Sequence, residues 1–410
     1  MDKTLTEFYS DLSDGQMSDL QEHLQKRVEH RKNKEDTFGV VFDMLHECNL
    51  RCKGCGTDAD ITLQQVINNP KPSYDEVVRV LEKLKQYSDT SGKKMFLNFG
   101  GGEPYLRGDI QEVLKYAAGL FGANGVAIDT NASLDESYDR IKASIPNLSN
   151  VGISINGLED HHNWWSGNSG INSFQRATGV VGKLCMDPNI REKIEVTSVP
   201  TKKNLQDIPE LMRFLADKGV QNYSVHRSMP VGRNKNQSHL IPSAQEYLKL
   251  LVDMIAVAKE TGINTHLHHS IESIHAALLL GLNTYADKEG NPDLRSSIGI
   301  EPEGKIVFDP WCTTGVWKSL PSGNLITDRD LDLHDHLSEE TGIFKLSKGF
   351  ASPETRCDGC EVTCSGGSRV AAAANKLSRI DAGRINEAQV LDAMTAVDPA
   401  CPLYEEGKSL

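Results

Sequence analysis

The chain has no apolar run of the roughly 18 residues that a transmembrane helix requires, so the sequence contains no membrane span. Its N-terminus, MDKTLTEFYSDLSDGQ, lacks the basic start and the apolar stretch of a secretory signal. We therefore expect a cytoplasmic protein. In that setting clustered cysteines bind metal or react more often than they form disulfides.

Positive charge is also scarce. The 44 Lys and Arg residues against 57 Asp and Glu give a formal net charge of −13. A nucleic-acid partner needs a basic surface, so we expect none. The apolar content of 38% and the charged content of 25% are ordinary for a globular protein, and 410 residues are enough for two or more domains.

Between residues 37 and 288, short apolar runs alternate with amphipathic segments. We expect strands at 40–45, 95–99, 126–129, 151–155, 194–199, 223–228 and, more weakly, 264–269. We expect helices at 74–87, 109–121, 173–186, 207–219 and 244–262. This repeat predicts an α/β fold with a parallel sheet of the partial (β/α)6-barrel type, whose active site lies at the C-terminal strand ends. A doubly wound open sheet is the competing topology.

Two segments flank this region. Residues 1–36 are polar, with Leu20 and Leu24 on one helical face, and predict a surface helix packed on the main body. Residues 289–410 predict a small second domain, with a hairpin at 297–312 that turns at Glu303-Gly304 and a helical piece at 384–396. Its apolar content is low and it holds five cysteines, so a metal staple is expected there.

Three cysteines, Cys48, Cys52 and Cys55, follow the first expected strand. Structural zinc normally takes four protein ligands, so three thiolates alone do not close a zinc site. A [4Fe–4S] cube held by three cysteines keeps one iron open for a substrate or cofactor. A zinc site with a distant fourth ligand also fits this spacing.

Polar loops follow the next three strands, on the same expected face. The second strand leads into Gly101-Gly102-Glu103, whose glycines permit close backbone approach to a ligand and whose carboxylate suits an amino group. Thr130 and Asn131 follow the third strand, and Ser154 ends the fourth.

These features resemble a radical S-adenosylmethionine (radical SAM) enzyme over residues 38–285. The resemblance implies a SAM-binding [4Fe–4S] cluster on Cys48, Cys52 and Cys55, with the Gly101–Glu103 stretch at the SAM amino group. It places Thr130, Asn131 and Ser154 near the ribose and carboxylate of SAM. It also implies that reductive cleavage gives a 5′-deoxyadenosyl radical that abstracts hydrogen from a substrate.

Two positions depart from the family. The residue before the third cysteine is commonly aromatic and lies near adenine, and here it is Gly54. The place of an arginine that meets the SAM carboxylate is held by Ser166. Arg176, Arg227, another cation or water are the substitutes considered for that arginine.

A second set of four cysteines lies in the C-terminal region: Cys357, Cys360, Cys364 and Cys401. Four thiolates suit a closed [4Fe–4S] cube or tetrahedral zinc. The region resembles a reduced SPASM- or twitch-like domain, which implies one auxiliary [4Fe–4S] cluster.

The other ligand set of a full SPASM domain is incomplete in this sequence. Asp328 and Ser368 stand at positions where the domain has cysteines, so Cys312 is left over. We expect it to be a buried free thiol, with a catalytic thiol or a metal ligand as the alternatives. Cys185 is expected to lie in the core.

Substrate-binding candidates are His226 and Arg227 after the sixth strand, with an internal salt bridge as the alternative, and His268 in the THLHH segment. Trp164 and Trp165 are expected to pack in the core, or one of them to line the pocket.

The resulting hypothesis is a radical SAM oxidoreductase or maturase acting on a small-molecule or cofactor-pathway substrate. The short N-terminal segment favours this over the close alternative, peptide maturation. The auxiliary cluster would assist electron transfer, and a flavodoxin- or ferredoxin-type protein would supply electrons. A non-catalytic iron–sulfur or zinc scaffold is the third reading.

Overall fold

The computed structural model describes residues 8–32, 37–59, 71–167, 170–267, 272, 275–276, 279–280, 297–307 and 323–337. Several residues named above lie outside these ranges: His268, Cys312, Cys357, Cys360, Cys364, Ser368, Cys401 and the expected helix at 384–396.

One nine-stranded sheet organises the described chain, in the order β7-β6-β5-β4-β3-β2-β1-β8-β9. Its strands are β1 (Thr37–Asp43), β2 (Lys94–Gly100), β3 (Val126–Thr130), β4 (Asn150–Ser154), β5 (Ile194–Ser198), β6 (Asn222–Val225), β7 (Asn264–Leu267), β8 (Ser297–Ile300) and β9 (Ile306–Val307). Strands β1 to β7 are parallel and follow one another in chain order. Every crossover therefore runs in the same direction, which puts the connecting helices on one face and excludes the doubly wound alternative.

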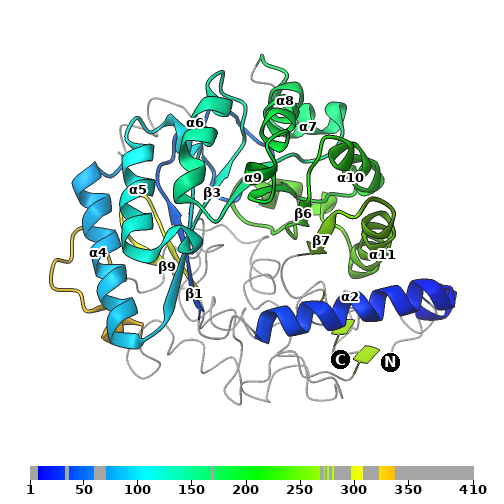
Figure 1. Cartoon of the computed structure of the whole chain (residues 1–410), viewed down its shortest axis with the longest axis horizontal. Helices are drawn as coiled ribbons and strands as arrows, with labels where there is room; N and C mark the ends of the chain where they lie inside the picture. Colours follow the sequence, from blue (N-terminus) through cyan, green and yellow to red (C-terminus); the bar gives the residue numbers. More distant parts are fainter. Residues whose placement is uncertain are drawn as a thin grey trace.

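Helices cover the outer face of this curved sheet, as Figure 1 shows for α4, α5, α6, α8, α10 and α11. The α-helices are α2 (Asp14–Lys32), α4 (Tyr74–Ser91), α5 (Ile110–Phe121), α6 (Ser137–Ser144), α7 (Glu159–Trp165), α8 (Ser173–Cys185), α9 (Pro188–Arg191), α10 (Asp207–Asp217), α11 (Ala244–Thr261) and α13 (Leu333–His336). The 3₁₀-helices are η1 (Pro104–Leu106), η2 (Ala123–Gly125), η3 (Ile145–Asn147) and η4 (Gly232–Leu240). No helix within the described ranges has both the length and the hydropathy to cross a membrane.

The alternation of side chains along each strand separates an apolar outer face from a polar inner face. In β1, Phe38, Val40 and Phe42 are fully buried or nearly so, and the Phe38 ring meets Tyr87 of α4 at 5.3 Å between centroids. On the inner face, Asn98 Nδ2 donates to Asp129 Oδ2 at 2.6 Å. The hydrophobic core therefore lies between sheet and helices, and the inside of the partial barrel carries polar groups.

The N-terminal helix α2 packs on the main body, as its sequence predicts. Leu20 and Leu24 are fully buried, and Lys259 of α11 forms an ion pair with Asp19 at 2.5 Å. Figure 1 shows α2 running beside α11. Cys185 is also confirmed as a core residue, since it is 4% exposed at the end of α8.

The expected hairpin at Glu303-Gly304 is present as β8 and β9, and Gly304 has a φ of +85° at its turn. Strand β8 pairs in parallel with β1, so the hairpin extends the barrel sheet on the side of β1 away from β2. The boundary at residues 288 and 289 stays a prediction. Asp328 lies in a following turn, where its carboxylate accepts a hydrogen bond from the Asn324 N–H at 3.0 Å.

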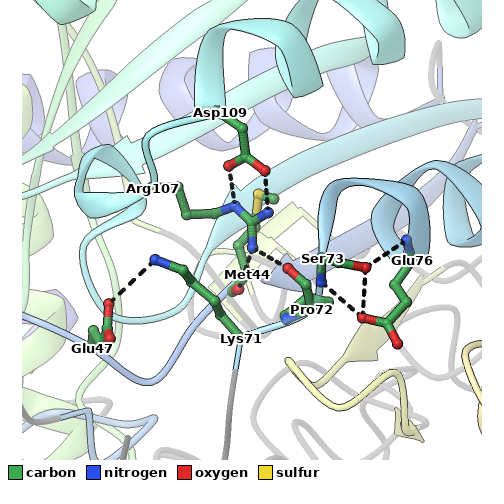
Figure 2. Close-up of polar contacts among 8 residues, drawn as sticks. All are labelled: Met44, Glu47, Lys71, Pro72, Ser73, Glu76, Arg107 and Asp109. Atoms are coloured by element: carbon green, nitrogen blue, oxygen red, sulfur yellow. Dashed lines mark hydrogen bonds and ion pairs between the residues drawn. The ribbon is translucent and has the colours of Figure 1, made fainter.

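A buried arginine fixes the segment that leaves β1. Arg107 is 1% exposed and donates from Nε and Nη2 to the Asp109 carboxylate at 3.0 and 2.8 Å. Its Nη1 donates to the Pro72 carbonyl at 2.8 Å and to the Met44 carbonyl at 3.4 Å (Figure 2). Lys71 reaches Glu47 on the same loop at 3.8 Å. One guanidinium thus joins the end of β1 to the starts of α4 and α5.

Replacing Arg107 by Met should lower the free energy of unfolding by roughly 3 kcal/mol, because two carbonyls and one carboxylate lose their buried donor. Asp109→Asn keeps a hydrogen-bond acceptor and should cost about 1 kcal/mol. Urea denaturation followed by circular dichroism measures both. Equal losses in the two variants would show that the two carbonyl contacts contribute nothing.

Candidate functional site

The loops that follow β1 and β2 are bonded backbone to backbone. Gly102 N donates to the Leu45 carbonyl at 2.8 Å, and Glu103 N donates to the Glu47 carbonyl at 2.9 Å. Gly101 has a φ of +107°, and a Cβ on Gly102 would lie 1.8 Å from the Glu47 oxygen. The two glycines are therefore required for approach to the cysteine loop itself, a role that the sequence analysis had given to a ligand.

Gly102→Ala should displace the cysteine loop and lower the free energy of unfolding by about 3 kcal/mol, the upper end for overpacking, because the new methyl meets a backbone carbonyl. Bound iron after anaerobic reconstitution should fall with it. Gly108→Ala is the matched control, since nothing lies within 4 Å of its added Cβ. A Gly102→Ala protein with wild-type iron and wild-type stability would contradict this reading.

The three cysteines lie together at the C-terminal end of β1. Cys48 is 9% exposed, and Cys52 and Cys55 are half-buried beside it. Cys48 Sγ accepts from Leu50 N at 3.4 Å and from Asn131 Nδ2 at 3.8 Å. Burial raises the pKa of Cys48 and of Cys52, the latter to about 12, and the neighbouring thiols raise both further. Deprotonated thiolates here therefore need a cation, such as an iron cluster, in contact with them.

Two further segments form hydrogen bonds with the backbone of the cysteine loop. Lys53 N donates to the Trp165 carbonyl at 2.8 Å, and Arg51 N donates to the Ser166 carbonyl at 3.2 Å. In η4, Arg233 donates from its backbone N to the Cys55 carbonyl and from Nε to the Cys52 carbonyl, both at 2.9 Å. The end of α7 and the start of η4 thus hold the backbone between the cysteines.

Glu103 forms hydrogen bonds with two of the polar residues that the sequence analysis singled out, Thr130 and Asn131. Its side chain is fully buried and accepts from Thr130 Oγ1 at 2.8 Å, Asn131 N at 2.8 Å and Tyr105 N at 3.1 Å. Burial raises the pKa of Glu103 to about 7, against the effect of these three donors. The carboxylate is thus turned into the protein, where it positions Thr130 and Asn131.

The inner face of the sheet holds further carboxylates. Burial raises the pKa of Asp43 to about 7, helped by Glu301, Asp129 and Glu303 and opposed by His46. Burial also raises the pKa of Asp129 to about 6, while its hydrogen bond from Asn98 acts the other way. Both groups sit on strands that end at the cysteine loop or beside it, and both exchange protons near neutral pH.

The raised pKa of Asp43 predicts a pH dependence of stability. The native state keeps this proton up to about pH 7, whereas the unfolded chain loses it near its ordinary value of 3.8. The unfolding free energy of the wild type should therefore fall, relative to Asp43→Asn, by as much as about 4 kcal/mol as the pH rises from 4 to 7.

Urea titrations at pH 4.5 and pH 7.5 measure this difference. The Asp217→Asn variant, which removes an exposed carboxylate from the end of α10, serves as control. A constant offset for Asp43→Asn would show that Asp43 titrates normally.

The substrate candidates take varied positions. His226 N donates to the Ser198 carbonyl at 2.8 Å, and burial lowers the pKa of its side chain to about 4, so it is neutral at pH 7. Arg227 is buried at 3% exposure. Ser154 ends β4, partly exposed.

Ser166, which stands in the place of the missing arginine, and Arg176, one of the proposed substitutes for it, both have bonding partners within the protein. Ser166 Oγ donates to the His162 carbonyl at 2.8 Å inside α7. Arg176 is held by the Ser133 carbonyl at 2.9 Å and by Asp135 at 2.8 Å.

The sequence analysis missed Arg233 and gave Trp165 only a packing role or a place in the pocket. The signal for Arg233 was a glycine before a basic residue in the loop after β6, and Gly232 indeed has a φ of +53°. That signal is too common to point to the distant cysteine loop.

The three cysteine thiolates suit an iron–sulfur cube better than a single metal ion. In the described part of the chain, no three Cys, His, Asp or Glu side chains lie close enough to hold one metal ion. Each thiolate of an iron–sulfur cube binds a different iron, so the sulfurs stand farther apart than around one zinc. The N–H groups directed at Cys48 also suit cluster-bound sulfur.

Comparison with known families agrees with this geometry. Residues 44–240 match the model of the radical SAM superfamily. This segment is a radical SAM domain. It runs from the end of β1 to η4 and contains the three cysteines, Glu103 and Arg233.

Several known proteins are similar to about half of the chain. The Fe-coproporphyrin III synthase of Methanosarcina barkeri is 26% identical over 54% of this chain and 53% of its own length. The AdoMet-dependent heme synthase of Nitratidesulfovibrio vulgaris is 26% identical over 52% of this chain and 54% of its own length. The chain thus spans about half the length of the curated relatives it matches.

Among solved structures, SuiB of Streptococcus suis bound to S-adenosylmethionine covers 86% of this chain with 77% of its own, at a TM-score of 0.62 and 18% identity. SuiB has also been solved with its precursor peptide SuiA. This likeness shows the fold, and the parallel sheet with outer helices is confirmed as a radical SAM fold.

Proposed function

We propose that the chain is a radical SAM enzyme in which Cys48, Cys52 and Cys55 hold a [4Fe–4S] cluster. When bound, the cluster and SAM supply hydrogen-atom abstraction through a 5′-deoxyadenosyl radical, which no protein side chain provides. One observation carries the proposal: the cysteine loop and the Gly101–Glu103 loop are bonded to each other inside the matched domain.

The chain's own residues then have distinct tasks. Main-chain atoms of Gly101 and Gly102 lie beside the cysteine loop, where they suit the amino group of SAM. Glu103 orients Thr130 and the backbone of Asn131. Asn131 Nδ2 is directed both at Cys48 Sγ and at Asn49 Oδ1, at 3.8 and 2.9 Å, and so couples the third loop to the cluster thiolate. Ser154, at the end of β4, remains the proposed fourth SAM contact.

The proposed substrate class is a small molecule of a cofactor pathway. Two similar curated proteins are named as synthases of an iron coproporphyrin and of heme, which supports this class. Peptide modification is the second candidate, because the fold likeness to SuiB, solved with a precursor peptide, extends over most of this chain.

Two further parts of the proposal concern electron supply. Cys357, Cys360, Cys364 and Cys401 are proposed to hold an auxiliary [4Fe–4S] cluster that accepts or passes electrons, with structural zinc as the alternative. A one-electron donor of the flavodoxin or ferredoxin type is proposed as the external partner. His226, Arg227 and His268 remain proposed substrate contacts.

Metal content tests the two cysteine sets. Iron and zinc per chain are measured on anaerobically reconstituted protein and on the Cys48/Cys52/Cys55→Ala variant. About eight irons falling to about four, with no zinc, is the expected result for two cubes. Cys185→Ala, which removes a buried helical thiol, should leave the iron unchanged. About four irons falling to none, with one zinc kept, would make the C-terminal site a structural staple.

A SAM-cleavage assay with a chemical reductant separates the enzyme from a non-catalytic scaffold. Formation of 5′-deoxyadenosine by the wild type, and none by the triple variant, is expected. Absence of cleavage by fully iron-loaded wild type would support the scaffold and end the proposal.

A further inference from the structure

Gly54 lies between the second and third cysteines of the loop and has no side chain to cover it. The indole of Trp165 takes that space. A Cβ on Gly54 would lie 2.1 Å from Cη2 and 2.2 Å from Cζ2 of Trp165, distances that no real contact allows. The ring therefore rests directly on the loop backbone, and no residue other than glycine fits at position 54 while it is there.

Trp165 is held firmly in this place. Its own carbonyl accepts from Lys53 N at 2.8 Å, so the residue is bonded to the neighbour of Gly54. The His161 ring stacks on the indole, with centroids 6.1 Å apart and an interplanar angle of 21°. Gly167, with a φ of +82°, brings the chain after α7 so near that a Cβ would be 2.0 Å from the Arg51 carbonyl. The indole is 3% exposed and cannot swing away without breaking this contact surface.

The neighbouring Trp164 has different surroundings. Lys203 Nζ stands 4.0 Å and Lys53 Nζ 5.4 Å from the centre of its ring, and the side chain is half-buried. Cations over the face of a half-buried indole are an ordinary arrangement near a protein surface. Of the two adjacent tryptophans, only Trp165 therefore has the closeness to the cysteine loop that a role at the site requires.

We propose that Trp165 is the aromatic wall of the SAM-binding cluster site and a positioning residue for SAM. Its indole replaces, from α7, an aromatic side chain that the loop itself does not carry at Gly54. The inference rests on the proposed function. Because Trp165 is 3% exposed and His161 covers one face of its ring, the indole acts on SAM through the loop: it excludes water from one side of the loop backbone and keeps that backbone in place. Loss of one binding contact worth about 1.4 kcal/mol, as expected when the loop backbone shifts, lowers an affinity roughly ten-fold.

The test uses the full chain with its clusters reconstituted and oxidised, so that SAM binds without being cleaved. Iron per chain and the dissociation constant for SAM, measured by calorimetry, are determined for each variant. Trp165→Ala should keep its iron and bind SAM about ten-fold more weakly, because the loop backbone at Gly54 loses its support, whereas Trp165→Phe keeps a ring against the loop and should stay within about three-fold of wild type. Trp164→Ala is the matched control and should bind SAM as the wild type does.

A reciprocal exchange makes the test specific. Gly54→Tyr alone should lose cluster iron, because its Cβ collides with the indole. Gly54→Tyr combined with Trp165→Ala should recover iron and SAM affinity, since the aromatic ring has moved from α7 to the loop. The remaining close neighbour of that Cβ is Asn234 Oδ1 at 2.9 Å, the end of a side chain that can give way.

The reduced cluster adds a spectroscopic readout. Its electron paramagnetic resonance signal should shift on SAM addition in the wild type and in the reciprocal double variant, and should shift little in Trp165→Ala at the same SAM concentration. A merely structural role for Trp165 would leave this shift unchanged in every variant that retains iron.

The outcomes separate this inference from the function on which it rests. Iron-loaded Trp165→Ala with wild-type SAM affinity would overturn the role of Trp165 and leave the radical SAM proposal intact. If Trp165→Ala loses iron, the double variant decides: recovered SAM affinity supports the role, and iron without SAM binding overturns it. Iron-loaded wild type that binds no SAM would overturn both proposals.

Discussion

The approach of two backbones at Gly101 and Gly102 is the constraint on which the rest of the site depends. The loops after β1 and β2 continue to exchange hydrogen bonds beyond the end of the sheet, and the second loop reaches the first only because position 102 has no side chain. This contact places Glu103 under the cysteine loop. Glu103 then fixes Thr130 and Asn131, and Asn131 reaches the first cysteine.

Around this contact two arginines hold backbone carbonyls. The buried guanidinium of Arg107 binds the Met44 and Pro72 carbonyls, while the half-buried Arg233 binds the Cys52 carbonyl through Nε and the Cys55 carbonyl through its backbone N–H. A guanidinium suits this task because its donors are fixed in one plane and point in several directions. The loop between two such groups is set by donors that come from distant parts of the chain.

Much of the fold could be predicted from the sequence, because period-two burial marks strands such as β1 and capping boxes mark helices such as α4 and α11. The short α6 and α7 were missed, since eight and seven residues give little periodicity. The cysteine spacing indicated the site, because ligands of one cluster lie close in sequence.

The inward turn of Glu103 and the contact of Trp165 with Gly54 could not be read from the sequence. The first depends on donors from β3 and η1, and the second joins residues that are more than a hundred positions apart. A sequence pattern shows which residue types are present, but the atoms that each side chain contacts are determined by tertiary packing.

The pairing of β8 with β1 has a consequence for how the chain matures. Gly39 lies opposite Ser297, so the strand that leads into the cysteine loop stays an edge strand until most of the chain has been synthesised. An edge strand exposes unpaired peptide groups and invites wrong partners. Contacts of such long range also form slowly, because a large loop must close first. Iron delivered before residue 297 has emerged from the ribosome would meet a cysteine loop whose supporting strand is paired on one side only.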